Sequence, residues 1–299
     1  MSKRMRAHIF LMTTAFIWGS AFVAQKEAMS YIGPFTFTGI RMLIGGSVLI
    51  PIIIMLGKKG FVSEDTPAVK GFINDPTYIG GFFCGVVLFF ACAFQQIGLV
   101  YTTAGKAGFI TALYIIIVPI LGLFMKKRVG KLIWFCVLIA LVGVYLLCMQ
   151  EDFTMNYGDI IMFLSSFCYA MHIITIDHFS PKGNPVKISC VQFFVCGILC
   201  FPTAIVEAPL LSDLLASWFP ILYAGAISCG IAYTLQVVAQ RDTKPTITAL
   251  ILSFESVFAV LMGFLLLNEL LSMKEVFGCV LMFAAIILAQ MPEKKGELQ

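Results

Sequence analysis

The sequence predicts an all-α membrane protein with ten transmembrane helices, arranged as two inverted-topology five-helix repeats around a central cavity, with both termini cytoplasmic. Three observations predict this fold: the composition, the placement of basic residues between apolar runs, and an internal repeat. Of the 299 residues, 60% are hydrophobic and 12% are charged, against about 45–50% and 25% in soluble domains. This composition excludes a soluble globular protein. The net charge of +4 comes without a basic stripe interleaved with aromatic residues, so we expect no nucleic-acid partner.

Ten apolar runs approach the length of about 20 helical residues that crosses a hydrocarbon core about 30 Å thick. In the first half they cover residues 7–28, 35–56, 78–101, 104–125 and 132–149. In the second half they cover residues 157–176, 186–206, 218–240, 245–267 and 276–291. The connections are short, so little of the chain remains for a domain outside the membrane.

The basic residues predict the orientation. With a cytoplasmic amino terminus, the outside keeps only Lys26, Arg41, Lys106 and Lys274. The inside segments hold the other sixteen: Lys3, Arg4, Arg6, Lys58, Lys59, Lys70, Lys126, Lys127, Arg128, Lys131, Lys182, Lys187, Arg241, Lys244, Lys294 and Lys295. Because basic loops stay on the cytoplasmic side, we expect both termini to lie inside.

The two halves of the chain resemble each other. A shift of 151 residues places Trp18 on Tyr169 and Arg41 on Gln192, and a shift of 137 superposes residues 110–113 on 247–250 letter for letter. We therefore expect one repeat in residues 1–150 and a second in 151–299. An odd number of helices per repeat gives the two copies opposite orientations, an architecture typical of alternating access around a midplane site.

Three stretches resemble the EamA family of the drug/metabolite transporter superfamily: WGSAFV at 18–23, GLVYTTAGKAGFITALYIIIVP at 98–119, and AQRDTKPTITALILSFESVFAVLMGFLLLNE at 239–269. The resemblance covers nearly the whole chain. It implies a multi-pass carrier of the plasma (inner) membrane with a central cavity, often an exporter of amino acids or related metabolites. One position departs: the family usually has Glu-Pro in the ninth span, whereas this chain has Glu255-Ser256, which removes a predicted kink.

Glu255 is the first candidate for transport chemistry. It lies near the middle of the ninth predicted span, with no basic residue within two turns of its helix. A charged carboxylate at a helix centre costs about 2.5–3.5 kcal/mol on insertion scales, so it rarely faces lipid. We interpret Glu255 as a site for a substrate amine or a coupling proton. The alternative is a structural carboxylate hydrogen-bonded across helices.

Polar stripes on two other spans indicate walls of the same cavity. Tyr233, Gln236 and Gln240 share one face of the eighth span, and Tyr169 and His172 share one face of the sixth. Such groups need hydrogen-bonding partners at membrane depth, which favours a cavity wall over lipid. His172 is the second coupling candidate because imidazole exchanges protons near neutral pH; alternatively, a neighbour simply satisfies it.

Gln192 on the seventh span is a further substrate-binding candidate. The others complete a ring of polar or aromatic side chains on other spans: Trp18, Gln25, Gln95 or Gln96, Thr111 and Tyr114. Their alternative role is hydrogen bonding between helices. Arg41 and Gln192 can each cap a pathway, and Arg41 can instead snorkel to the interface. Aromatic rings beside amides suit a solute with an apolar body and polar ends, such as an amino acid or an amphipathic, drug-like amine.

These features predict a secondary carrier and not an enzyme. No Gly-rich phosphate-binding loop with Lys and Ser or Thr is present, so ATP is not the direct energy source. The ten cysteines lie in apolar runs, and we expect no cofactor or metal. The expected partners are a small solute and the lipid bilayer, and a monomer can suffice. Two alternatives stay open: an intramembrane enzyme, and a lipid scramblase with a polar groove open to lipid.

Overall fold

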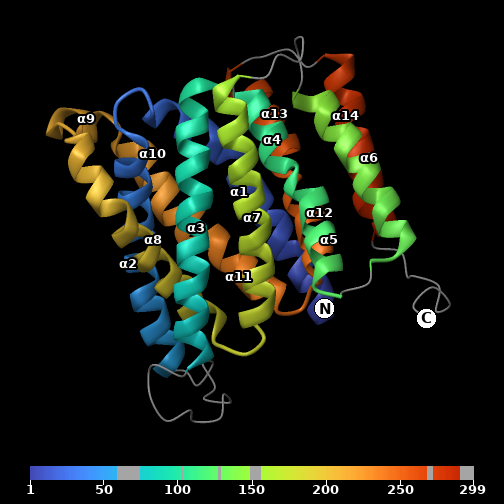
Figure 1. Ribbon diagram of the computed structural model, residues 1–299, viewed down its shortest axis with the longest axis horizontal. Helices are drawn as coiled ribbons and strands as arrows, with labels where there is room; N and C mark the ends of the chain where they lie inside the picture. The colour runs from blue at the N-terminus through green and yellow to red at the C-terminus, as the bar shows by residue number, and fades with distance from the viewer. Residues whose placement is uncertain (59–74, 103, 127–128, 149–155, 268–271, 290–299) are drawn as a thin grey trace.

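The computed structural model describes residues 1–58, 75–102, 104–126, 129–148, 156–267 and 272–289, and these form helices without any strand (Figure 1). The first half contains α1 (Lys3–Ala28), α2 (Pro34–Lys58), α3 (Pro76–Tyr101), α4 (Ala104–Ala112), α5 (Tyr114–Phe124) and α6 (Lys131–Cys148). The second half contains α7 (Tyr157–Phe179), α8 (Pro185–Glu207), α9 (Leu211–Ala216), α10 (Trp218–Leu222), the π-helix η2 (Tyr223–Tyr233), α11 (Thr234–Gln240), α12 (Pro245–Leu252), α13 (Glu255–Leu267) and α14 (Met273–Ala289).

Eight segments of the described chain are long and apolar enough to cross a membrane. They correspond to the first four and the sixth to ninth predicted spans. The fifth and tenth predicted spans appear as α6 and α14, of 18 and 17 residues, which fall short of that measure within the described residues. Six basic residues of the orientation argument lie outside the described residues: Lys59, Lys70, Lys127, Arg128, Lys294 and Lys295.

The outer faces of the bundle are apolar. On α3, the side chains of Phe82, Phe83 and Phe90 are about half exposed, and on α8 Ile198 and Phe201 are more exposed still. Polar side chains point the other way. Large exposed apolar faces on successive helices are unusual in a soluble protein, and they give this bundle the lipid-facing surface of a multi-pass membrane protein.

The two halves pack as reciprocal pairs. Helix α2 packs on α8, and α6 packs on α14, in each case an element on its counterpart in the other repeat. In the second half, η2 and α11 are the counterpart of α3, and α7 is the counterpart of α1. The α3–α7 contact therefore matches the contact of α1 with η2 and α11, and the α3–α8 contact matches that of η2 with α2. The contacts of α1 with α12 and α13 match those of α7 with α4 and α5. This exchange of partners is what a two-fold relation between the halves requires.

Two predicted spans are interrupted helices. The fourth breaks at Leu113, between α4 and α5, and the ninth breaks at Ser253 and Phe254, between α12 and α13. At the second break the amides of Phe254 and Ser256 bond three residues back, and Ser253 Oγ donates to the carbonyl of Leu250 at 2.8 Å. A side chain that competes for backbone groups loosens a helix. The missing proline therefore does not leave this helix uninterrupted.

Candidate functional site

A small cavity lies between the halves, with a volume of about 30 Å³. Its walls come from α1, α2, α3, α4, α5, α7, η2 and α13, and they carry Trp18, Phe22, Gln25, Arg41, Gln95, Thr111, Tyr114, Tyr169, Ser228, Tyr233 and Glu255. This volume holds about one water molecule. The structure therefore represents a closed form of the site.

Eight of the thirteen residues proposed from the sequence come together around this cavity: Trp18, Gln25, Gln95, Thr111, Tyr114, Tyr169, Tyr233 and Glu255. Sequence reasoning missed Phe22 and Ser228. Phe22 belongs to the WGSAFV stretch that carried the family resemblance, so a signal was present. Ser228 lies within a π-helix, which residue spacing at the α-helical period does not reveal; such helices are often found at functional sites.

Glu255 and Tyr114 form one end of the site. The Tyr114 hydroxyl donates to Glu255 Oε1 at 3.1 Å, and both residues are buried. Tyr114 is the first residue of α5 and Glu255 the first residue of α13, so the two breaks bring these residues together. A helix start offers free amide donors and a partial positive charge, which favours a carboxylate. This position explains how a buried acid is tolerated.

Arg41 forms another part of the wall. Its side chain is 2% exposed, so the snorkelling alternative is wrong. Its Nη1 donates to Gln25 Oε1 at 2.8 Å, and Gln96 Nε2 donates to the same oxygen at 2.5 Å. The guanidinium carbon lies 5.1 Å from the centre of the Phe37 ring, within range of a cation–π contact. Gln96 thus supports the cavity wall from behind.

Aromatic residues make up the remaining wall. The rings of Trp18 and Tyr233 lie 4.5 Å apart between centroids. The Tyr233 hydroxyl donates to the Tyr169 hydroxyl at 3.4 Å, which in turn donates to Gln95 Oε1 at 2.9 Å. Cys92 Sγ lies 3.4 Å from the Tyr169 oxygen. The chain of bonds fixes two phenols and an amide on the cavity surface.

The other sequence candidates serve contacts between and along helices. His172 Nε2 and Gln192 Oε1 are hydrogen-bonded at 3.0 Å, which joins α7 to α8. Gln236 Nε2 donates to Gln240 Oε1 at 3.0 Å, and Gln240 Nε2 donates to the Ile173 carbonyl at 2.8 Å. None of these four, nor Gln96, lines the small cavity. Gln96, His172 and Gln192 thus serve contacts between helices, whereas Gln236 bonds along α11 and Gln240 also borders a larger cavity.

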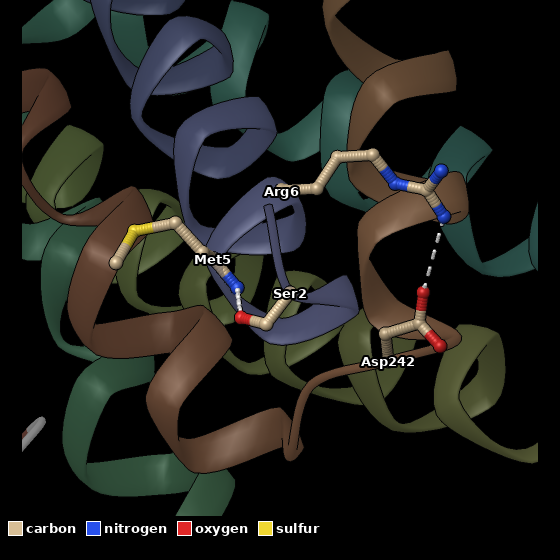
Figure 2. A network of polar contacts seen from close by, with 4 residues as sticks. All are labelled: Ser2, Met5, Arg6 and Asp242. Carbon is tan, nitrogen blue, oxygen red and sulfur yellow. Dashed lines mark hydrogen bonds and ion pairs between the residues drawn. The ribbon is translucent and has the colours of Figure 1, made fainter.

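The two ends of the bundle differ. At the end with the α11–α12 connection there is a cavity of about 440 Å³, bordered by Asp177, Gln240, Arg241 and Lys244 among others. Beside it, Arg6 Nη2 lies 3.7 Å from Asp242 Oδ2 and links α1 to the α11–α12 connection (Figure 2).

The opposite end is fastened by hydrogen bonds that are partly buried. The Glu207 carboxylate accepts from the amides of Phe35 and Thr36 at 3.0 and 2.7 Å, and from the Thr36 hydroxyl at 2.6 Å. Lys26 Nζ donates to the Leu99 carbonyl at 2.7 Å. These bonds join the second-half helix α8 to α2, and α1 to α3.

An apolar-surfaced helical bundle with a cavity lined by polar and aromatic side chains between two reciprocal halves is a multi-pass membrane protein built around an internal site. The model of the EamA-like transporter family matches residues 5–149 and 156–291, one match in each half. The chain therefore belongs to the EamA-like transporter family, and it is a membrane transporter and not an enzyme.

Known relatives agree. An uncharacterized transporter of Archaeoglobus fulgidus is 32% identical over 97% of this chain and 87% of its own length. The uncharacterized transporter YetK of Bacillus subtilis is 23% identical, with 99% and 90% covered. A chloroplastic WAT1-related protein of Arabidopsis thaliana is 22% identical, with 95% and 69% covered. A crystal structure with 17% identity matches 96% of this chain and 97% of its own with a TM-score of 0.78, and this match shows the fold alone.

Proposed function

We propose that the protein is a secondary transporter that exports a small metabolite, an amino acid or an amphipathic amine, across the plasma membrane by alternating access. The observation that carries this proposal is the small cavity, whose walls come from both halves and hold polar and aromatic side chains together with the buried acid Glu255. A polar cavity at the junction of two repeats is where carriers of this architecture bind their solutes.

The proposal includes ten spans in two inverted repeats, 1–150 and 151–299, with both termini cytoplasmic. The reciprocal packing of α6 and α14 supports counting them as the fifth and tenth spans, since each takes the other as partner. The start of α1 and the end of α14 also lie toward the same edge of the bundle (Figure 1). The basic residues assign that edge to the cytoplasm.

Alternating access is supported by the difference between the two ends. The 440 Å³ cavity lies at the end that the basic residues assign to the cytoplasm, whereas at the opposite end the hydrogen bonds of Glu207 fasten the second half to the first. A rocking motion of the halves would break the bonds of Glu207 and close the 440 Å³ cavity at the other end. A solute entering from the cytoplasm would thus meet the 440 Å³ cavity first, and the small cavity would have to widen before the solute could bind there.

Counterflow into liposomes tests the proposal. The purified protein is screened against amino acids, amines, nucleosides and organic anions, with and without a pH gradient, and the recovered solute is checked by mass spectrometry. We expect at least one solute to cross chemically unchanged. A protein that moves no solute, or that moves only fluorescent lipids between leaflets, would contradict the proposal, and the second result would favour a scramblase.

Glu255→Gln tests the acid, because it keeps the side-chain volume and removes the ionisable carboxyl group. We expect it to abolish transport while size-exclusion profiles stay unchanged. Glu275→Gln is the matched control: Glu275 is also a buried carboxylate, but it accepts from the Ser272 amide at the start of α14, away from the cavity. Full transport by Glu255→Gln would remove Glu255 from the mechanism.

A further inference from the structure

We propose that Arg41 binds a carboxylate group of the transported solute, an inference that rests on the proposed transport function. Arg41 is a strongly basic side chain, 2% exposed, in the wall of the small cavity. Desolvated charges in proteins are normally paired. We therefore look to the solute for the negative group that pairs with Arg41.

The hydrogen bonds of the guanidinium group show which edge is free. Nη1 donates to Gln25, whereas Nε and Nη2 are buried and have no hydrogen-bond partner in the described part of the chain. The N–H bonds of Nε and Nη2 point side by side along one edge of the planar group. Two parallel N–H donors match the two oxygens of a carboxylate, and arginine is favoured where such two-point recognition is needed.

The protein itself does not neutralise this charge within the described residues. The ion pair found there joins Arg6 to Asp242 on the outside of the bundle. Glu255 lines the same cavity, but its carboxylate accepts from Tyr114 and forms no ion pair with Arg41. The contacts of Arg41 with Gln25 and Phe37 stabilise a cation without cancelling it. An acidic solute would supply the missing negative charge.

The rest of the cavity is compatible with such a solute. Trp18, Phe22 and Tyr233 offer apolar surface, and Glu255 with Tyr114 can accept from an amine or a hydroxyl group. The volume of about 30 Å³ is too small for a whole metabolite. The carboxylate therefore meets Arg41 when the halves move apart and the site widens.

The repeat provides the test variant. Gln192 occupies in α8 the position that Arg41 occupies in α2, and it is fully buried with a hydrogen bond to His172. A glutamine thus folds at the equivalent position of this architecture. Arg41→Gln removes the charge and the paired donors while keeping a polar amide. Lys274→Gln is the matched control, since it removes a positive charge from α14, outside the cavity wall.

The experiment uses the full chain in liposomes and matched pairs of solutes. The pairs are L-phenylalanine with phenethylamine, L-leucine with 3-methylbutylamine, and 3-phenylpropionate with its amide, so that each pair differs by a carboxylate. We expect the wild type to move carboxylate members and to discriminate against their partners. We expect Arg41→Gln to lower uptake of the carboxylate members at least about tenfold, the effect of losing a charge-assisted bond, and Lys274→Gln to leave it unchanged.

The outcomes separate the two proposals. If the wild type moves only the members without a carboxylate, or if Arg41→Gln moves the carboxylate members as well as the wild type, the role of Arg41 is overturned while transport stands. If the wild type moves no member of any pair and no solute of the counterflow screen, the transport function fails and this inference falls with it.

A second variant protects the test against misfolding. Arg41→Lys keeps the positive charge but lacks the two parallel donors. If Arg41→Gln does not give a single size-exclusion peak, we expect Arg41→Lys to show uptake of the carboxylate members at least about threefold below wild type, because a lysine binds as a point charge. Wild-type uptake by Arg41→Lys would then overturn the proposal. The rise in melting temperature that a transported carboxylate solute gives to the wild type should shrink in the same variant.

Discussion

Gly19→Ala places one methyl group between α1 and α13, directly beside the acid of the site. A Cβ atom at Gly19 would lie 2.6 Å from the backbone oxygen of Glu255, 2.6 Å from Phe258 Cβ and 2.8 Å from the backbone nitrogen of Ala259. Two of these three neighbours are backbone atoms, which cannot rotate away. The two helices must therefore separate.

The size of the effect follows from these distances. Ordinary carbon contacts begin at 3.4 Å, so the gap must widen by about 0.8 Å from the 2.6 Å found here. Overpacking of this kind costs about 1–3 kcal/mol, and we expect the upper part of this range because the backbone is rigid. At about 2–4 °C per kcal/mol, the melting temperature should fall by roughly 4–12 °C. Since Glu255 moves with α13, transport should also fall, at least about tenfold.

Gly230→Ala is the matched control. The nearest atom to a Cβ there is Val48 Cγ1 at 3.5 Å, an ordinary contact. Melting is followed by fluorescence-detected size exclusion after heating, and transport by counterflow in liposomes. The control should melt within about 3 °C of the wild type, since alanine fits and is the better helix former. If Gly19→Ala behaves like Gly230→Ala in both assays, the close approach of α1 and α13 is refuted.

Three further substitutions test other contacts. Glu207→Gln should lower stability by about 1–3 kcal/mol, read as a lower melting temperature, because the start of α2 loses charged acceptor bonds; an unchanged melting curve would contradict the role of Glu207. Arg6→Gln should change stability by less than about 1 kcal/mol, because Arg6 and Asp242 are 49% and 24% exposed; a large loss in the same assay, at low and high salt, would contradict this reading. Tyr114→Phe should lower the free energy of unfolding by about 1.5–3 kcal/mol, because Glu255 loses its hydrogen-bond donor. A double-mutant cycle in thermal unfolding should show a smaller loss in a Glu255→Gln background. Equal losses in both backgrounds would refute the coupling.

The helical fold could be predicted because the thickness of the bilayer sets the length of the apolar runs and the membrane sets the sides on which basic loops lie. The breaks within the helices could not be predicted. The fourth and ninth predicted spans read as single apolar runs, and nothing in their periodicity marks Leu113 or Ser253 as an interruption. The known helix breaker, proline, is absent from the second break, where i to i−3 bonds and the Ser253 hydroxyl act instead.

The sequence predicted which helix faces line the site, but not how far along each helix the site extends. Tyr233, Gln236 and Gln240 share one face, but at 1.5 Å per residue Gln236 lies about 4.5 Å and Gln240 about 10.5 Å further along the axis, taken as an ordinary α-helix. A cavity of about 30 Å³ extends only a few ångströms, so it reaches Tyr233 and neither glutamine. Arg41 lies near one end of its predicted span, where a long basic side chain can reach the interface, and only packing shows that its side chain turns inward.

The bonds of Glu207 have no counterpart in the other repeat. At the shift of 151 residues, Glu207 corresponds to Leu56 and Thr36 to Lys187, so the equivalent pair at the opposite end contains no carboxylate. Two conformations that are held shut by unequal bonds differ in free energy, and their populations follow that difference. In the alternating access proposed above, the bonds of Glu207 would favour the form shut at that end, and weakening that carboxylate should redistribute the population toward the opposite form before any solute is added.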